Sequence, residues 1–329
     1  MTTSHFPVDS ELELPQEESS HLGDAREVYD ALVDRLSRQS VTKRYECYAD
    51  IPWDDPEYAL DPTDPRFEVP ATSSLGATDW YRSQPPELRA RLGCHMTATF
   101  MKTGRQFESV LKQGMLRFAA TLPDGAPEYR YCYHEIIEEA HHSLMFQEFV
   151  VRSGLEVEGL SKVKQRGARF VAKLGDHFPE LFLFFVLGGE DPIDYIQREA
   201  MQDESRANMH PLLRTISKIH ITEEARHMAF ARAYLRLHVP ELSAYRRLRL
   251  KIGIPGILRN MAPLMMRPSE QLIREYQIPD EVIQEAYTTN TEHQRIAAEA
   301  LRKVRDLCVE LGLAHAPFDR LWKGAHIWA

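Results

Sequence analysis

Residues 131–150 read YCYHEIIEEAHHSLMFQEFV and contain two overlapping Glu-x-x-His pairs, Glu138/His141 and Glu139/His142. Side chains three residues apart lie on one face of a helix, so a Glu and a His at this spacing can bind one metal ion or share a dinuclear site. The face of Glu139 continues mainly through apolar residues, whereas the face of Glu138 continues through polar and charged ones. We therefore predict that Glu139 and His142 point inward and that the other pair does not.

A second stretch, residues 213–235, reads LRTISKIHITEEARHMAFARAYL and places His220, Glu224 and His227 at positions i, i+4 and i+7. These three side chains share one helical stripe that is otherwise apolar. Because unpaired charge in an apolar interior is costly, the stripe indicates a compensating cation. The adjacent Glu223 is followed at i+3 by an arginine rather than a histidine. We interpret that pair as solvated or as lying behind the ligands.

Dinuclear carboxylate bundles combine two Glu-x-x-His helices with one further glutamate from each of two other helices. Before the first motif, Glu108 is the only acidic residue between positions 97 and 122. Between the motifs, Glu190 directly follows the apolar run LFLFFVLGG, where a carboxylate is otherwise a misfit. Functional residues often break the local pattern in this way. The predicted metal ligands are therefore Glu108, Glu139, His142, Glu190, His220, Glu224 and His227.

The surroundings of Glu190 suggest a distorted helix. Pro192 lacks an amide hydrogen, and Gly188 and Gly189 have no side-chain bulk. These features predict a kink or a π-bulge. We form the hypothesis that the distortion makes room beside the metals for dioxygen and a substrate.

Outside these motifs the chain is mostly helix-like. Residues 25–40 have helical spacing, and residues 51–80 contain five prolines and must be extended or turning. From position 85 onward, long helix-like segments with short breaks predict an antiparallel, all-α bundle. The predicted organisation is a disordered acidic tail (1–22), a helix with a proline-rich wrap (23–84), a helical domain with additional C-terminal helices (85–315) and a C-terminal tail (316–329).

Composition narrows the classes of protein. With a formal charge of −9, broad attraction to nucleic acid or to an anionic membrane is not expected. The longest apolar run, nine residues, is far shorter than the ~20 residues of a membrane span. The N-terminus lacks the features of a signal peptide. Four dispersed cysteines suit a reducing compartment, so we expect a cytoplasmic protein.

The chain resembles the p-aminobenzoate N-oxygenase family of ferritin-like non-haem diiron enzymes. The resemblance covers residues 95–240 and rests on Glu108, on EEAHH with Glu139 and His142, on GGEDPID with Glu190, and on HITEEARH with its third histidine, His220. It implies two iron ions per chain, although the oxygen and nitrogen ligands also suit manganese. It further implies bridging by Glu139 and Glu224, and dioxygen as co-substrate. The implied partners are an aryl amine that is oxidised to a hydroxylamine or nitro product, an external electron donor and a second copy of the chain.

Other readings of the sequence remain. Within the diiron class, the enzyme could hydroxylate C–H bonds. A ferritin-like ferroxidase or iron-binding protein is a second class, although 329 residues exceed what a storage subunit needs. A radical-generating subunit is a third and would require a tyrosine near the metals, such as Tyr131, Tyr133 or Tyr234. A substrate carboxylate would require a cation, for which Arg105, Arg198 and Arg295 are candidates.

Overall fold

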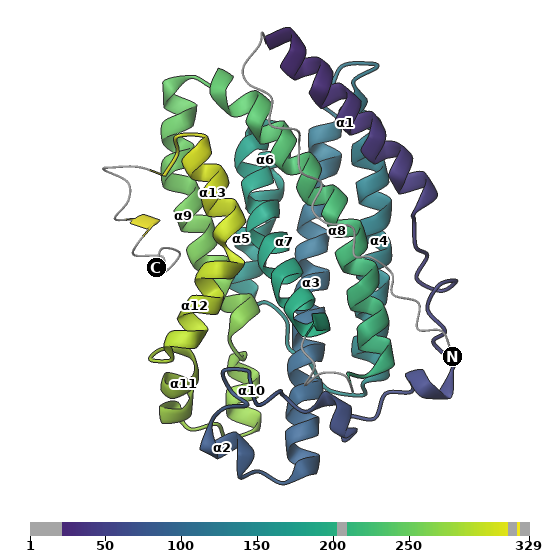
Figure 1. Ribbon diagram of the computed structural model, residues 1–329, viewed down its shortest axis with the longest axis vertical. Coiled ribbons are helices and arrows are strands. Elements are labelled where there is room, and N and C mark those ends of the chain that lie inside the picture. Colours follow the sequence, from purple (N-terminus) through teal and green to yellow (C-terminus); the bar gives the residue numbers. More distant parts are fainter. Residues whose placement is uncertain (1–21, 203–208, 315–320, 323–329) are drawn as a thin grey trace.

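The computed structural model describes residues 22–202, 209–314 and 321–322, which form helices and turns without any strand (Figure 1). The all-α, ferritin-like prediction is confirmed. The predicted tail 1–22 lies outside the described residues except for its last residue, and of the predicted tail 316–329 only residues 321–322 are described. Among the described residues, no helix is both long and apolar enough to cross a membrane.

Four long helices form the bundle: α3 (Pro86–Ala119), α4 (Pro127–Arg152), α7 (Pro179–Gln202) and α8 (Pro211–His238). Figure 1 shows them side by side. Each begins at a proline, whose fixed φ suits the first turn and whose missing N–H has no helical partner there. The two Glu-x-x-His motifs therefore lie on α4 and α8, as predicted.

The N-terminal part covers one side of this bundle. Helix α1 (Leu22–Thr42) packs on α4 and α8. The proline-rich segment that follows holds only short elements, η1 (Pro56–Tyr58), η2 (Pro65–Phe67) and α2 (Asp79–Arg82). Its buried side chains Cys47, Ile51, Trp53 and Phe67 pack against residues of α3, α4 and α8. The segment is therefore part of the folded core, although the division of the chain into domains stays a prediction.

Shorter helices complete the molecule. Helices α5 (Lys162–Ala172) and α6 (Leu174–His177) connect α4 to α7 and pack on α3. After η4 (Val239–Glu241), helix α9 (Ala244–Met266) packs along α7. The remaining elements are α10 (Glu270–Glu275), α11 (Asp280–Tyr287), α12 (Thr291–Ala300) and α13 (Arg302–Glu310).

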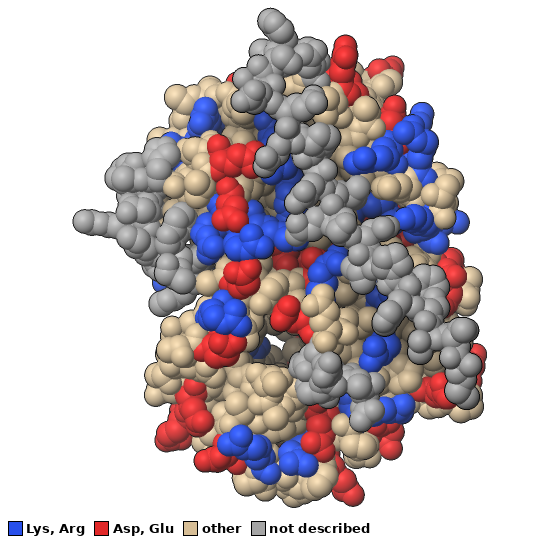
Figure 2. Space-filling model, viewed as in Figure 1, with Lys and Arg blue, Asp and Glu red and all other residues tan. Residues whose placement is uncertain are grey.

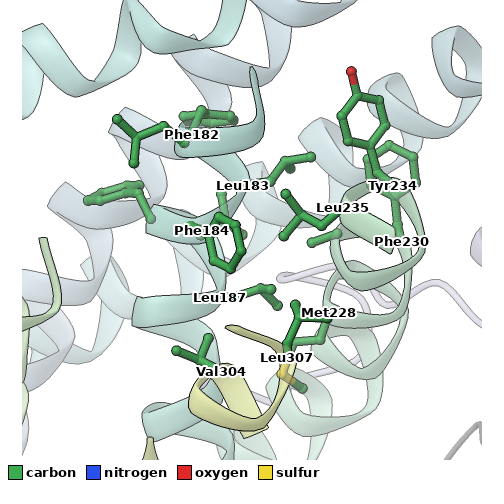
Figure 3. Close-up of a cluster of buried hydrophobic side chains, with 14 of the residues drawn as sticks. Phe182, Leu183, Phe184, Leu187, Met228, Phe230, Tyr234, Leu235, Val304 and Leu307 are labelled. Atoms are coloured by element: carbon green, nitrogen blue, oxygen red, sulfur yellow. The ribbon is translucent and has the colours of Figure 1, made fainter. Parts of the chain in front are cut away.

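Helix α7 is the centre of the core. Its apolar run is buried on all sides because α3, α8, α9 and α13 surround it. Figure 3 shows Phe184 and Leu187 of α7 beside Leu235 of α8 and Val304 of α13. A helix that is apolar all round is stable only when it is enclosed in this way. Any charged side chain on α7 that points into the core therefore lies in a dry environment.

The outer surface carries charges of both signs. In the part of the face that Figure 2 draws in colour, Lys and Arg alternate with Asp and Glu. Helices α12 and α13 contribute close ion pairs, Arg295 with Glu292 at 2.6 Å and Arg302 with Glu299 at 2.6 Å. This coloured part of the surface shows no broad positive area of the kind that nucleic acid binding requires.

We expect Gly175→Ala to destabilise the protein by about 3 kcal/mol, because the added methyl group would overpack the contact between α6 and α3. A Cβ at Gly175 would lie 2.0 Å from the backbone oxygen of Gly114 on α3, and backbone cannot move aside cheaply. The control is Gly167→Ala in α5, where a Cβ meets nothing within 4 Å. That variant should gain about 0.5–1 kcal/mol from helix propensity. Denaturant unfolding measures both, and equal stabilities would contradict the α3–α6 packing.

Candidate metal centre

The structure brings together all seven side chains that the sequence singled out. Helix α3 provides Glu108, α4 provides Glu139 and His142, α7 provides Glu190, and α8 provides the other three, His220, Glu224 and His227. All seven are completely buried. Six of them form overlapping groups of three, in which the candidate ligand atoms lie within 4.8 Å of one another. His227, the seventh, lies against the same cluster.

Glu139 and Glu224 occupy the middle of the cluster. The Glu139 Oε1 and Oε2 atoms lie 2.9 Å from His227 Nδ1 and 3.3 Å from His142 Nδ1. The Glu224 Oε1 atom lies 3.2 Å and 3.3 Å from the same two nitrogens and 3.8 Å from His220 Nε2. Each carboxylate thus lies between histidines on different sides of the cluster, which suits a ligand shared by two ions.

The cluster contains more acceptor atoms than the protein satisfies. Both carboxylate oxygens of Glu108, Glu190 and Glu224 are buried without a hydrogen-bond partner, as is the His220 Nε2 atom. Each unsatisfied buried polar atom costs about 1–3 kcal/mol. Four carboxylates balance the charge of two divalent cations, and mixed oxygen and nitrogen ligands suit iron or manganese. The residues present therefore fit a dinuclear metal centre.

The protonation states of the cluster residues should depend on whether a metal ion is bound. Burial, followed by neighbouring carboxylates, raises the pKa of Glu108 and of Glu190 well above the usual range. Burial opposes ionisation of Glu224 too, but the combined effect of His227 and His142 outweighs it and lowers the pKa to about 2. For His142, hydrogen bonds to carboxylates outweigh burial and raise the pKa. Without metal, protons balance the buried charge; metal binding has to displace them, so affinity should fall as pH falls.

Two of the histidines each contact a glutamate of the opposite helix through Nε2, the ring nitrogen that points away from the cluster. His142 of α4 directs Nε2 toward Glu223 of α8 at 2.9 Å, and His227 of α8 directs Nε2 toward Glu138 of α4 at 2.8 Å. Arg226 donates to Glu138 at 2.8 Å and lies 3.6 Å from Glu223. Such outer carboxylates fix which ring nitrogen faces the metal and raise its basicity.

This arrangement corrects the prediction that Glu138 faces away from the interior. Glu138, Glu223 and Arg226 are all buried, because α1 and the N-terminal segment cover the outer side of α4 and α8. Glu223 lies behind His142, on the side away from the cluster, so the interpretation of a solvated pair is wrong. The backbone N–H of Tyr45 donates to Glu223 at 3.0 Å, so the N-terminal segment braces the site directly.

Two further side chains, Gln197 and Lys112, support the cluster. His220 Nδ1 lies 3.1 Å from the side-chain oxygen of the buried Gln197 on α7, which leaves Nε2 directed at the cluster. Lys112 of α3 donates its Nζ to the Glu139 backbone oxygen at 2.9 Å and to the Ser143 hydroxyl at 2.5 Å. All three histidines of the cluster therefore have a polar partner behind them, and Lys112 joins α3 to the helix that carries Glu139.

Helix α7 has no π-bulge beside the cluster, and the alternative of a kink at Pro192 stays a prediction. The α-helix continues through Pro192 without a π-helical turn. A Cβ at Gly189 would lie 2.2 Å from the Phe107 ring, so this glycine allows a close ring contact rather than an open space. Phe107 stacks near Phe185 at 4.9 Å between ring centroids, and Phe146 lies 5.5 Å from His220. The packing of α7 against α8 and α9 holds the helix in place.

We expect Glu223→Leu to weaken metal affinity about 10- to 100-fold, the usual cost of removing an outer-shell partner. The substitution removes the acceptor behind His142 Nε2 and the acceptor of the Tyr45 N–H. Glu223→Gln keeps one acceptor oxygen, which can serve His142 Nε2 but not the Tyr45 N–H as well, so its affinity should lie between those of the wild type and the leucine variant. Competition with a chelator measures both. Equal affinity in the leucine variant and the wild type would show that Glu223 does not position the ligand.

An α-helical bundle with two inward Glu-x-x-His helices and one glutamate from each of two others defines the class of ferritin-like carboxylate bundles. The chain belongs to the family described as P-aminobenzoate N-oxygenase AurF, whose match covers residues 26–312. It is 34% identical over 295 residues to an uncharacterized protein of Mycobacterium bovis and, to the same extent, to uncharacterized proteins of two Mycobacterium tuberculosis strains. These matches cover 90% of this chain and 86% of each relative. No solved structure matches the chain significantly.

Proposed function

We propose that the protein is a non-haem diiron oxygenase that uses dioxygen to convert an aryl amine into its hydroxylamine or nitro product. The ligands of the two iron ions are the seven cluster residues, with Glu139 and Glu224 as the shared carboxylates. Two bound iron ions supply the electrons that activate dioxygen. The single observation that supports this proposal best is the buried cluster of four carboxylates and three histidines with its unpartnered oxygens, together with membership of the family.

The protein's own residues have separate tasks in this proposal. Glu138, Glu223 and Gln197 orient the three histidines. Phe107 and Phe146 keep water from the cluster and offer apolar faces to an aromatic substrate. An external protein supplies the electrons that restore the ferrous state. We further propose that the protein works in the cytoplasm as a homodimer.

The arginines differ in their availability for a substrate carboxylate. Arg198 is paired with Asp194 at 2.8 Å, and Arg295 is paired with Glu292 at 2.6 Å. The half-buried Arg105 has no hydrogen bond or ion pair with another described residue, and its Nε atom is buried without a partner. Of the three, Arg105 is therefore the candidate for binding a carboxylate on the aryl amine.

The test combines iron-loaded protein, a chemical reductant, dioxygen and a panel of amines that includes p-aminobenzoate and aniline. The proposal predicts hydroxylamine or nitro products by mass spectrometry, with oxygen atoms that come from ¹⁸O₂. Products hydroxylated on carbon would assign C–H oxidation instead. Iron that is oxidised at the same rate with and without every amine, and without organic product, would indicate a ferroxidase and exclude the oxygenase.

A further inference from the structure

A row of aromatic side chains leads away from the metal centre between α4 and α8. Tyr131 of α4 lies against Phe230 of α8 with 4.5 Å between ring centroids. The ring centroid of Phe230 is 6.2 Å from that of Tyr234, which in turn is 4.1 Å from that of His238. Figure 3 labels Phe230 and Tyr234 on α8. Each step lies within the range of ordinary ring contacts. The row is thus continuous from one ring to the next.

The outer end of the row lies just below the surface of α1. The ring of Tyr29 is 6.2 Å from that of His238. The Arg26 guanidinium lies 5.4 Å from the Tyr29 ring centroid, and the Arg26 side chain is 44% exposed. Arg26 also donates to the buried carboxylate of Glu128 at 3.3 Å, so this carboxylate lies at the same end of the row as Tyr29. A proton acceptor therefore accompanies the outermost tyrosine.

The inner end of the row lies beside the metal ligands. Phe230 follows the proposed ligand His227 by one helical turn on α8. Glu135 follows Tyr131 by one helical turn on α4, so the carboxyl and the phenol lie on the same face of that helix. Glu135 is itself buried, with an oxygen that has no hydrogen-bond partner. A buried carboxyl thus accompanies the innermost tyrosine as well.

Packing alone does not explain Tyr131. It is completely buried, and its hydroxyl has no hydrogen-bond partner. An unpaired buried hydroxyl costs about 1–3 kcal/mol, whereas phenylalanine would fill the same space without that cost. What the phenol adds is redox chemistry, because tyrosine loses an electron to a strong oxidant far more readily than phenylalanine does.

We propose that this row protects the protein by carrying oxidising equivalents from the metal centre to the surface when no substrate is bound. The inference rests on the proposed function, because only a strongly oxidising centre can oxidise tyrosine. The terminal reductant is a thiol in solution. The row contains the residues Tyr131, Phe230, Tyr234, His238 and Tyr29.

The inner steps balance in electrons and protons. Tyr131 transfers one electron to the oxidised metal centre and its phenolic proton to Glu135, whose carboxyl the nearby cations keep ionised. Tyr234 then transfers an electron to the Tyr131 radical across Phe230 and passes its own proton to His238. Burial lowers the pKa of His238, so this imidazole is neutral and can accept the proton. Tyr131 recovers its proton from Glu135.

The outer steps repeat this exchange. Tyr29 reduces the Tyr234 radical and passes its proton to Glu128, while Tyr234 recovers its proton from the imidazole. A thiol then reduces the Tyr29 radical, which recovers its proton from Glu128. The net transfer is one electron from the thiol to the metal centre, and the thiol proton goes to water. Two such transfers convert two thiols into one disulfide.

The test uses iron-loaded, reduced protein that is mixed with dioxygen in the absence of substrate and thiol, frozen, and examined by electron paramagnetic resonance. We expect a tyrosyl radical in the wild type and its loss in Tyr131→Phe. The matched control Tyr133→Phe, at an exposed position on the same helix, should keep the signal.

Melting temperature and dioxygen consumption separate the alternatives. Tyr131→Phe should melt no lower than the wild type, because the hydroxyl has no partner. Dioxygen consumption without a tyrosyl radical, or a radical that persists in Tyr131→Phe, overturns this inference and leaves the proposed function standing. Protein that binds no iron or consumes no dioxygen overturns the proposed function and this inference with it.

Discussion

Glu139→Ala should bind less than one iron per chain and lose at least about 100-fold in amine oxidation, because even outer-shell losses cost 10- to 100-fold. The reason is the position of Glu139, which lies within 3.3 Å of both His142 Nδ1 and His227 Nδ1. Removing a shared ligand weakens both ion sites together, whereas removing a terminal ligand weakens mainly one. Iron analysis after anaerobic loading and gel filtration measures the effect.

The control for this variant is Glu148→Ala, on the same helix but away from the cluster. Glu148 pairs with Arg152 at 3.2 Å at the surface. This variant should bind iron and oxidise amine as the wild type does. If Glu139→Ala also kept two irons per chain, Glu139 would not be a ligand and the assignment of the centre would be wrong.

Glu190→Leu should abolish full iron loading and yet stabilise the metal-free protein by about 1–3 kcal/mol. Both Glu190 oxygens are buried without partners amid the apolar surface of α7. Leucine fills a similar volume without an unsatisfied polar group. The metal-free protein therefore becomes more stable, although it loses a metal-binding side chain. Denaturant unfolding in the presence of a chelator measures the stability.

The stabilisation by Glu190→Leu should grow as pH rises. Burial raises the pKa of Glu190 well above its unfolded value of about 4.3, so the folded protein holds this proton more tightly than the unfolded chain. The stability of the metal-free wild type therefore decreases through this group as pH rises above that value, and leucine removes the contribution. Glu180→Leu on the same helix is the control, because Glu180 pairs with Arg246 at 2.9 Å and its loss should not stabilise. A Glu190→Leu variant less stable than the wild type would contradict the unpaired-carboxylate account.

Periodicity was enough to predict the long helices and the residues of the cluster. On α8 the spacing of His220, Glu224 and His227 fixes one face whatever the rest of the fold does. Glu108 and Glu190 stood out because each is a single acid in an apolar context, and α3 and α7 place both in the same cluster. Local pattern was sufficient here because helix geometry alone sets these directions.

The residues behind the ligands required knowledge of tertiary contacts. Glu138 seemed to face outward because its own helix face is polar, but α1 covers that face and makes it interior. The signal that could have revealed it is the repeated doublet, Glu138-Glu139 and Glu223-Glu224, at the same place in both motifs. Gln197 had no such signal, since its role depends on how α7 packs against α8. The structure has no π-bulge in α7, because the helices packed around α7, and not Pro192 alone, determine its path, whereas the kink stays a prediction.

The most direct test of the central claim is anomalous X-ray diffraction at the iron edge from crystals of the wild type loaded with ferrous iron. The account predicts two iron peaks within the cluster, both in contact with Glu139 and Glu224, with His142, His220 and His227 around them. A single peak, or iron bound outside this cluster, would contradict the assignment of a dinuclear centre to these seven residues.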